Sequence, residues 1–289
     1  MQLKLPLMRA KERVRSSPRK SKETRYSDVP RNEIIEGDCL EILQHLPAAS
    51  VDMILCDLPY GTTQNRWDSV IPLDKLWAEY RRVISNNGVI ALTAQGAFTA
   101  KLINAAEDLF RYKIVWVKSK PTNFLNARRQ PLRRHEDICI FYKRPPRYYP
   151  QMEPGLPYSK GVRKDQTTGS YGDFRPVLVE SGGSRFPTDV VYFKTAESEG
   201  PVWHPTQKPV ALARYLIRTF TAPGALVLDN ACGSGSFLVA ALLEGRDFLG
   251  IELNQSSHTY KHKDANYVEI ARERIALAKC AIPLKDAQL

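Results

Sequence analysis

The stretch LVLDNACGSGSFLVAALLEGRDFLGIE, residues 226–252, decides the fold class. Residues 226–229 form a short apolar run typical of a buried strand, and residues 236–243 form a longer run typical of a helix. A second strand pattern follows at residues 248–252. Two strands separated by a glycine-rich turn and one helix predict a βαβ unit, whose strands are parallel.

The same alternation extends over most of the chain. Apolar strand patterns occur at residues 34–35, 51–56, 88–92, 113–117 and 138–142. A helical stretch runs from Asp38 to Leu46, and another begins near Pro209 and ends before Pro223-Gly224. We therefore expect an α/β domain built on a largely parallel sheet.

Changes in composition mark where this domain begins and where an insertion interrupts it. Residues 1–32 are rich in Lys, Arg, Ser and Pro with no apolar periodicity, which predicts a disordered basic tail. Residues 145–203 accumulate Pro, Gly and Tyr and have apolar runs only at 177–179 and 190–193, which predicts a loop-rich insertion. With 289 residues and 43% hydrophobic content, one α/β domain of residues 33–144 and 204–289 plus this insertion accounts for the chain.

Location and metal content are also constrained by sequence. No stretch has the apolar length of a membrane span, and residues 1–10 lack a signal-peptide pattern, so we expect a cytoplasmic protein. Five scattered cysteines without a CxxC pair argue against a disulfide framework. His258 and His262 have ligand spacing but no cysteine pair nearby, so we expect a surface pair and no metal site.

The net charge of +11 is concentrated in two zones. Residues 1–32 hold ten Lys or Arg against three acidic residues, and residues 111–149 hold eleven against two. The rest of the chain is therefore mildly acidic. Two basic zones on an acidic body indicate a polyanionic partner, although either zone alone could be an ordinary solvated charge run.

Two turns at strand ends carry candidate chemistry. Asp229 to Gly235 is a glycine-rich turn, and Glu252 ends the next strand, where a carboxylate can hold ribose hydroxyls. The dehydrogenase fingerprint GxGxxG fails because Leu238 occupies its third glycine position. Asp57-Leu58-Pro59-Tyr60 follows another strand, although taken alone this tetrapeptide is more often a capped turn.

Four motifs together resemble the DNA amino-methyltransferases. Asp57 to Tyr60 resembles their DPPY catalytic motif, and Asp229 to Gly235 resembles their DPFxGSG cofactor loop. The segment His204 to Pro209, sequence HPTQKP, looks like the approach to the methionine end of the cofactor, and Gly37-Asp38-Cys39 looks like the acid that touches its adenine. The catalytic motif precedes the cofactor loop, an order similar to the β group of this family.

The resemblance implies a Rossmann-like, mostly parallel, seven-stranded methyltransferase sheet with helices on both faces and S-adenosylmethionine as cofactor. Residues 33–144 become the catalytic half, 145–203 an inserted target-recognition region and 204–289 the cofactor-binding half. The implied catalytic residues are Asp57, Leu58, Pro59 and Tyr60. The implied cofactor-binding residues are Asp38, Cys39, Thr206, Gln207, Lys208, Asp229, Ala231, Cys232, Gly233, Ser234, Gly235 and Glu252.

This chain departs from the family pattern at three positions. Leu58 replaces the first proline of DPPY, but its backbone carbonyl remains available. Asn230 and Ala231 replace Pro-Phe in the cofactor loop, so the contact that the phenylalanine makes must come from elsewhere. We expect these changes to affect affinity more than reaction type.

The expected chemistry explains the catalytic motif. The exocyclic amine of adenine is a poor nucleophile and is enclosed in a duplex, so the base must be flipped out. Asp57 and the Leu58 carbonyl can then accept hydrogen bonds from the amine, while Tyr60 stacks on the base. The family resemblance favours N6 of adenine, because Asp or Asn usually begins the adenine motif and Ser the motif for N4 of cytosine.

The partner implied by the family is double-stranded DNA, and we expect Arg128, Arg129, Arg133 and Arg134 to follow its phosphate backbone. Trp116 and Phe141 in the same zone are expected core residues, and His135 a structural hydrogen-bonding partner. Restriction-modification is a role consistent with the family. The sequence allows a homodimer without requiring one.

Three alternatives remain open at this point. N4-cytosine methylation uses the same geometry. A protein-glutamine or RNA methyltransferase would have a related tetrapeptide but usually places the cofactor loop first. A nucleic-acid-binding module that has lost catalysis would fit the basic zones if the altered loop no longer held its ligand.

Overall fold

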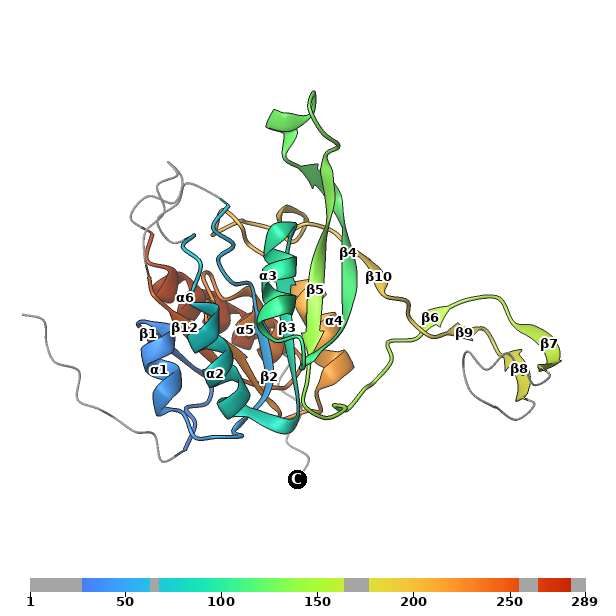
Figure 1. Cartoon of the computed structure of the whole chain (residues 1–289), viewed down its shortest axis with the longest axis horizontal. Coiled ribbons are helices and arrows are strands. Elements are labelled where there is room, and N and C mark those ends of the chain that lie inside the picture. The colour runs from blue at the N-terminus through green and yellow to red at the C-terminus, as the bar shows by residue number, and fades with distance from the viewer. Residues whose placement is uncertain (1–27, 63–67, 164–176, 255–264, 282–289) are drawn as a thin grey trace, which may run out of the picture.

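A computed structural model describes residues 28–62, 68–163, 177–254 and 265–281. They form an α/β domain around one large sheet, with two long projections (Figure 1). Both the α/β class and the mostly parallel sheet expected from the sequence are confirmed. In the described part of the chain, every helix falls short of the length and apolar character needed to cross a membrane.

The sheet has eight strands. In spatial order they are β1 (Glu33–Glu36), β12 (Asp247–Glu252), β11 (Leu226–Asp229), β2 (Val51–Cys56), β3 (Ile84–Ala94), β5 (Arg133–Phe141), β4 (Phe110–Thr122) and β10 (Val190–Phe193). Only β5 runs antiparallel to its neighbours.

The expected count of seven strands was one too low. The additional strand is β10, which comes from the region expected to be loop-rich and pairs in parallel with Val115 to Lys118 of β4. Pairing satisfies backbone groups that would otherwise lie open along the edge of β4, and it buries Val191. A four-residue apolar run cannot by itself reveal which strand it pairs with.

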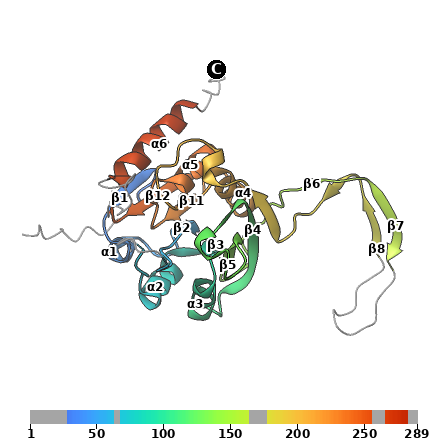
Figure 2. The ribbon, with the colours of Figure 1, turned by 90° about the horizontal axis from the view of Figure 1, so that it is seen from above.

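Helices cover both faces of the sheet, as expected (Figure 2). One face packs against α1 (Cys39–His45), α2 (Leu73–Val83) and α3 (Ala97–Ala105). The other packs against α4 (Val210–Phe220), α5 (Ser236–Leu243) and α6 (Tyr267–Ala281). The strands are buried on both faces, which explains their continuous apolar runs.

Two projections leave this body (Figure 1). The hairpin of β4 and β5 rises beyond the sheet and carries the short helix η1 (Phe124–Asn126) at its tip. A second arm holds two small sheets, β6 (Glu153–Pro154) with β9 (Ser184–Arg185) and β7 (Tyr158–Arg163) with β8 (Val177–Ser181), before the chain returns through β10 and η2 (Ala196–Ser198).

The carboxyl ends of the parallel strands meet at one edge of the sheet, which is where α/β proteins bind ligands. Asp57 directly follows β2, while Asp229 and Glu252 end β11 and β12. Asp38 lies just beyond β1, which pairs with β12, and its side chain caps α1 by accepting from the Leu40 N–H at 2.7 Å. Residues far apart in sequence therefore share this edge.

Candidate active site

A cavity of about 790 Å³ opens at this edge. Its lining contains Asp38 and Glu252 together with Asp57, Lys208 and Asp229, so the two ends of the domain meet as the permuted motif order requires. All the sequence-predicted catalytic and cofactor-binding residues line it except one. These are Asp38, Cys39, Asp57, Leu58, Pro59, Tyr60, Thr206, Gln207, Lys208, Asp229, Ala231, Cys232, Gly233, Ser234 and Glu252.

The exception is Gly235, which is absent from the lining. It takes a left-handed conformation with φ of 77° at the start of α5. A Cβ atom at this position would lie 2.8 Å from the Cβ of Ala271 in α6. This glycine therefore shapes the turn and lets two helices approach, instead of facing the cavity.

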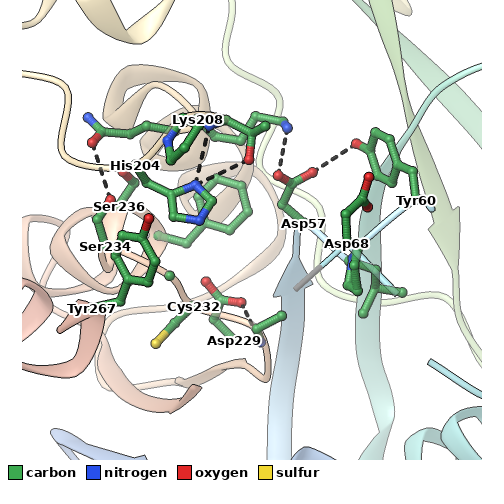
Figure 3. Close-up of a pocket in the computed structure, with 18 of the residues that line it drawn as sticks. Asp57, Tyr60, Asp68, His204, Lys208, Asp229, Cys232, Ser234, Ser236 and Tyr267 are labelled. Carbon is green, nitrogen blue, oxygen red and sulfur yellow. Dashed lines mark hydrogen bonds and ion pairs between the residues drawn. The ribbon is translucent and has the colours of Figure 1, made fainter. Parts of the chain in front are cut away.

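The Asp57 carboxylate is held by three side chains, two of which, Tyr60 and Lys208, are seen in Figure 3. The Tyr60 hydroxyl donates to its Oδ1 at 2.8 Å, and the Thr93 hydroxyl donates to the same oxygen. Lys208 Nζ donates to Oδ2 at 2.6 Å. The sequence did not reveal Thr93, because it is one of several polar residues in an otherwise apolar strand.

Lys208 belongs to a buried chain of charges. Its ammonium lies 3.4 Å from Glu136 Oε2, and Lys118 Nζ lies 3.1 Å from Glu136 Oε1. Burial lowers the pKa of Lys208, but Asp57 and Glu136 outweigh it and raise the pKa to about 12. Burial likewise raises the pKa of Glu136, but the two lysines outweigh it and lower the pKa below its ordinary range. Lys208 is thus charged and the Glu136 carboxyl ionised at neutral pH.

Two further carboxyl groups face the cofactor side of the cavity. Glu252 accepts from the Gly233 N–H at 2.7 Å and from the Asn254 N–H at 2.9 Å, and burial raises its pKa. Asp229 is almost fully buried, and burial raises its pKa to about 8. Glu252 therefore braces the glycine turn, while Asp229 is largely protonated at neutral pH.

The HPTQKP segment contacts the glycine turn directly. Gln207 Oε1 accepts from the Trp203 N–H at 2.9 Å and from the Ser234 hydroxyl at 3.2 Å. Arg274 of α6 supports the turn from behind by donating to the Ser234 carbonyl at 2.6 Å. Arg274 is a supporting residue that no motif signalled, because it comes from a different helix.

The departures from the family loop have a structural account. Asn230 is buried and accepts from the Tyr80 hydroxyl at 2.5 Å, so its amide is tied into the core. No aromatic ring stands at Ala231, but Phe237 and Tyr267 line the same cavity. Apolar and aromatic contact with a ligand is therefore available from α5 and α6.

The four arginines expected on a DNA track are divided between two places. Arg128 and Arg129 are exposed near the tip of the β4–β5 hairpin. Arg133 lines the cavity and donates to Gln95 Oε1 at 2.8 Å, while Arg134 donates to the Lys118 carbonyl at 3.4 Å. Arg133 thus links the hairpin to the site, whereas Arg134 bonds across the two strands of the hairpin.

Three of the remaining residues singled out by sequence lie within the described ranges. Trp116 and Phe141 are buried in the core, as expected. His135 is exposed on β5, and its backbone carbonyl accepts from Gln95. His258 and His262 lie outside the described residues. Within the described ranges, no group of three or more His, Cys, Asp or Glu is placed to hold a metal ion.

Asp68 is another residue that the motifs did not reveal. It is buried beside the catalytic motif and accepts from the Gly61 and Thr62 N–H groups, each at 2.8 Å. These bonds fix the turn that follows Tyr60. No sequence motif pointed to Asp68, because it lies seven residues from Gly61, whose N–H group it binds.

Comparison with known proteins agrees with this geometry. The family model described as DNA methylase, N6_N4_Mtase, matches residues 51–263. The DNA adenine methyltransferase YhdJ of Escherichia coli strain K12 is 29% identical over 246 residues, which cover 80% of this chain and 81% of that protein.

Solved structures share the fold. The M1.HpyAVI–SAM complex has a TM-score of 0.54 and 23% identity, covering 84% of this chain and 98% of that chain. The PvuII DNA methyltransferase, which is cytosine-N4-specific, has a TM-score of 0.54 and 13% identity, covering 86% of this chain and 94% of that chain. At these identities the likeness concerns the fold.

Proposed function

The chain belongs to the DNA methylase family, and from this membership we propose that it transfers a methyl group from S-adenosylmethionine to N6 of adenine at a specific site in double-stranded DNA. The adenine assignment is supported by the relative YhdJ and by Asp57 at the first position of the catalytic tetrapeptide. The single observation that carries the reaction is the shared cavity, which contains both this tetrapeptide and the glycine turn.

The cavity fits the cofactor by size and by the chemistry of its lining. A volume of about 790 Å³ lies in the usual range for small-molecule sites. Glu252 ends a strand next to the glycine turn, where a carboxylate can accept from ribose hydroxyls, and Asp38 lies across from it at the end of β1. Buried carboxyl groups suit a ligand that carries positive charge on its sulfonium and amino groups. When bound, S-adenosylmethionine supplies an electrophilic methyl group.

The catalytic motif acts on the base. Asp57 follows a buried strand and is anchored by Tyr60 and Thr93, so its carboxylate has a fixed direction. Accepting hydrogen bonds from the amine localises the nitrogen lone pair, and these bonds strengthen as positive charge develops on nitrogen. Asp57 does not have to be a strong base, because the amine becomes acidic once methylated.

Base flipping explains why the motif is enclosed. An adenine inside a duplex cannot reach Asp57, so the base must leave the stack and enter the cavity. The Tyr60 ring, already stacked on Phe98 at a centroid distance of 4.9 Å, offers an aromatic platform for it. Leu58 is buried, so it contributes through its backbone carbonyl.

We place DNA along the edge of the sheet that carries the cavity. The β4–β5 hairpin rises from this edge, and its exposed Arg128 and Arg129 can contact phosphates (Figure 1). The arm within residues 145–203 is the proposed target-recognition region, because it extends well beyond the sheet. Residues 33–144 and 204–289 then serve as catalytic and cofactor-binding halves.

The decisive experiment uses plasmid DNA. The full chain is incubated with S-adenosylmethionine and DNA, the product is digested to nucleosides, and methylated positions are mapped by modification-sensitive sequencing. N6-methyladenine at one recurring sequence is expected. N4-methylcytosine alone would overturn the base assignment, and an absence of both transfer and cofactor-binding heat would indicate a DNA-binding module.

A further inference from the structure

The ammonium of Lys208 occupies the positions that the target base is proposed to use. It donates to Asp57 Oδ2 at 2.6 Å and lies over the Tyr60 ring, 5.6 Å from its centroid. Lys208 is 8% exposed, so little water competes for these contacts. The catalytic carboxylate and its aromatic neighbour are therefore covered by one cation.

Counting the acceptor sites on Asp57 shows where a target amine must bind. Each carboxylate oxygen has about two lone-pair directions. Oδ1 already receives the Tyr60 and Thr93 hydroxyls, so a target amine must share Oδ2 with the Lys208 ammonium, which uses one of its two directions. A methyl transfer places positive charge on the amine nitrogen, and an ammonium on the same oxygen would then oppose the reaction.

Glu136 offers the ammonium a second position. Its Oε2 lies 3.4 Å from Lys208 Nζ, and this buried oxygen has no hydrogen bond among the described residues. Its Oε1 is already bonded to Lys118 at 3.1 Å. A buried carboxylate oxygen without a hydrogen bond is costly, so a small shift of Lys208 toward Glu136 would satisfy an acceptor that is now unsatisfied.

We propose that Lys208 is a movable counter-ion, which covers Asp57 until the target base enters and then moves onto Glu136. The proposal rests on the proposed function. Lys208 remains protonated in both positions, so the move transfers charge within the site without transferring a proton. The Asp57 carboxylate loses its counter-ion only when the amine is present, and Lys208 and Glu136 act as positioning residues.

A double-substitution experiment tests this role. Glu136→Gln removes the receiving charge and leaves Lys208 on Asp57, so kcat should fall about ten- to a hundredfold, the range for one charge-assisted hydrogen bond that must be broken. Adding Lys208→Gln to that variant removes the obstructing ammonium and restores charge balance with Asp57 and Lys118. The double variant should therefore be at least severalfold faster than Glu136→Gln alone. A purely structural role predicts a further loss instead.

Cofactor affinity separates this role from direct cofactor binding. The family resemblance implies a cofactor contact for Lys208, but its ammonium is held by Asp57 and Glu136, so this proposal assigns it to the base. Calorimetry with S-adenosylmethionine should therefore give nearly the same Kd for wild type, Glu136→Gln and the double variant. Lys113→Gln is a matched control, because Lys113 forms a 3.0 Å pair with Asp137 on the same two strands but does not line the cavity. Its kcat should stay at the wild-type value.

Several results would overturn the proposal. These are a wild-type kcat for Glu136→Gln, a double variant slower than the single one, or a Lys208→Gln variant that loses cofactor affinity. If Glu136→Gln does not fold, Glu136→Asp is used instead, because its shorter side chain moves the negative charge away from Lys208. Adding Lys208→Gln to that variant must then raise kcat in the same way. Failure of the proposed function is distinct, since wild type itself would then transfer no methyl group to adenine.

Discussion

Replacing the buried acid Asp229 by Asn should stabilise the protein relative to wild type, and this gain should grow as the pH rises. Asp229 is 3% exposed at the end of β11, and burial raises its pKa from the ordinary 3.8 to about 8. The charges of Asp57 and Glu252 raise it further, while bonds from the Cys56 thiol and the Ala231 N–H lower it. Asn preserves the shape and the acceptor oxygen but never ionises.

The sign follows from linkage. A carboxyl whose pKa is raised in the folded state binds its proton more tightly there than in the unfolded chain. Stability is then highest below the unfolded pKa and is lost as pH rises through the folded pKa, between about pH 4 and pH 8. Each unit of pH in this window removes about 1.4 kcal/mol, so at pH 7 the loss in wild type is on the order of 4 kcal/mol.

Urea unfolding at several pH values from 5 to 8 measures this effect. The stability of Asp229→Asn relative to wild type should increase by about 1.4 kcal/mol per pH unit. Asp247→Asn is the control, because hydrogen bonds from Arg31 and Asn32 lower the pKa of Asp247, so that its contribution is lost only at acid pH. Its difference from wild type should stay constant over the same range. Parallel pH profiles for Asp229→Asn and wild type would refute the reasoning.

Three other variants test the site and the DNA surface. Asp57→Ala should leave S-adenosylmethionine affinity nearly intact in calorimetry but lower methyl transfer by at least about a hundredfold, because it removes an acceptor needed mainly in the transition state. Loss of cofactor binding would contradict the assignment of Asp57 to the base. Glu252→Gln should weaken S-adenosylmethionine binding by about tenfold, the usual consequence of losing a charged acceptor, and an unchanged Kd would remove Glu252 from the ribose site. Arg128→Ala combined with Arg129→Ala should weaken binding similarly for all DNA sequences and reduce the slope of log K against log salt by about two, whereas an unchanged slope would show that the hairpin tip does not contact phosphates.

Local patterns were sufficient to identify most of the elements. The apolar run at 226–229, the glycine turn and the helix at 236–243 all lie where the sequence indicated, because each depends on residues only a few positions apart. The same holds for the strand at 51–56 and for Asp57 at its end. The motif order also correctly implied that Asp38 and Glu252 share one cavity.

Long-range pairing was not contained in those patterns. The short run at 190–193 became the eighth strand because β4 offered it an unpaired edge 75 residues earlier in the chain. Gly235 was expected to face the cofactor, but its role follows from the proximity of Ala271 in a different helix. Neither relation has a local signal.

The sequence by itself determined the strands, the turns and the catalytic tetrapeptide, since backbone preference and apolar periodicity act over short distances. Only the tertiary structure decided which charges meet. The bond of Lys208 to Asp57, which lies 151 residues away, and the contact with Glu136 arise because the sheet brings β2, β5 and the segment before α4 to one edge. A buried cation takes the nearest carboxylates in space, whatever their separation along the chain.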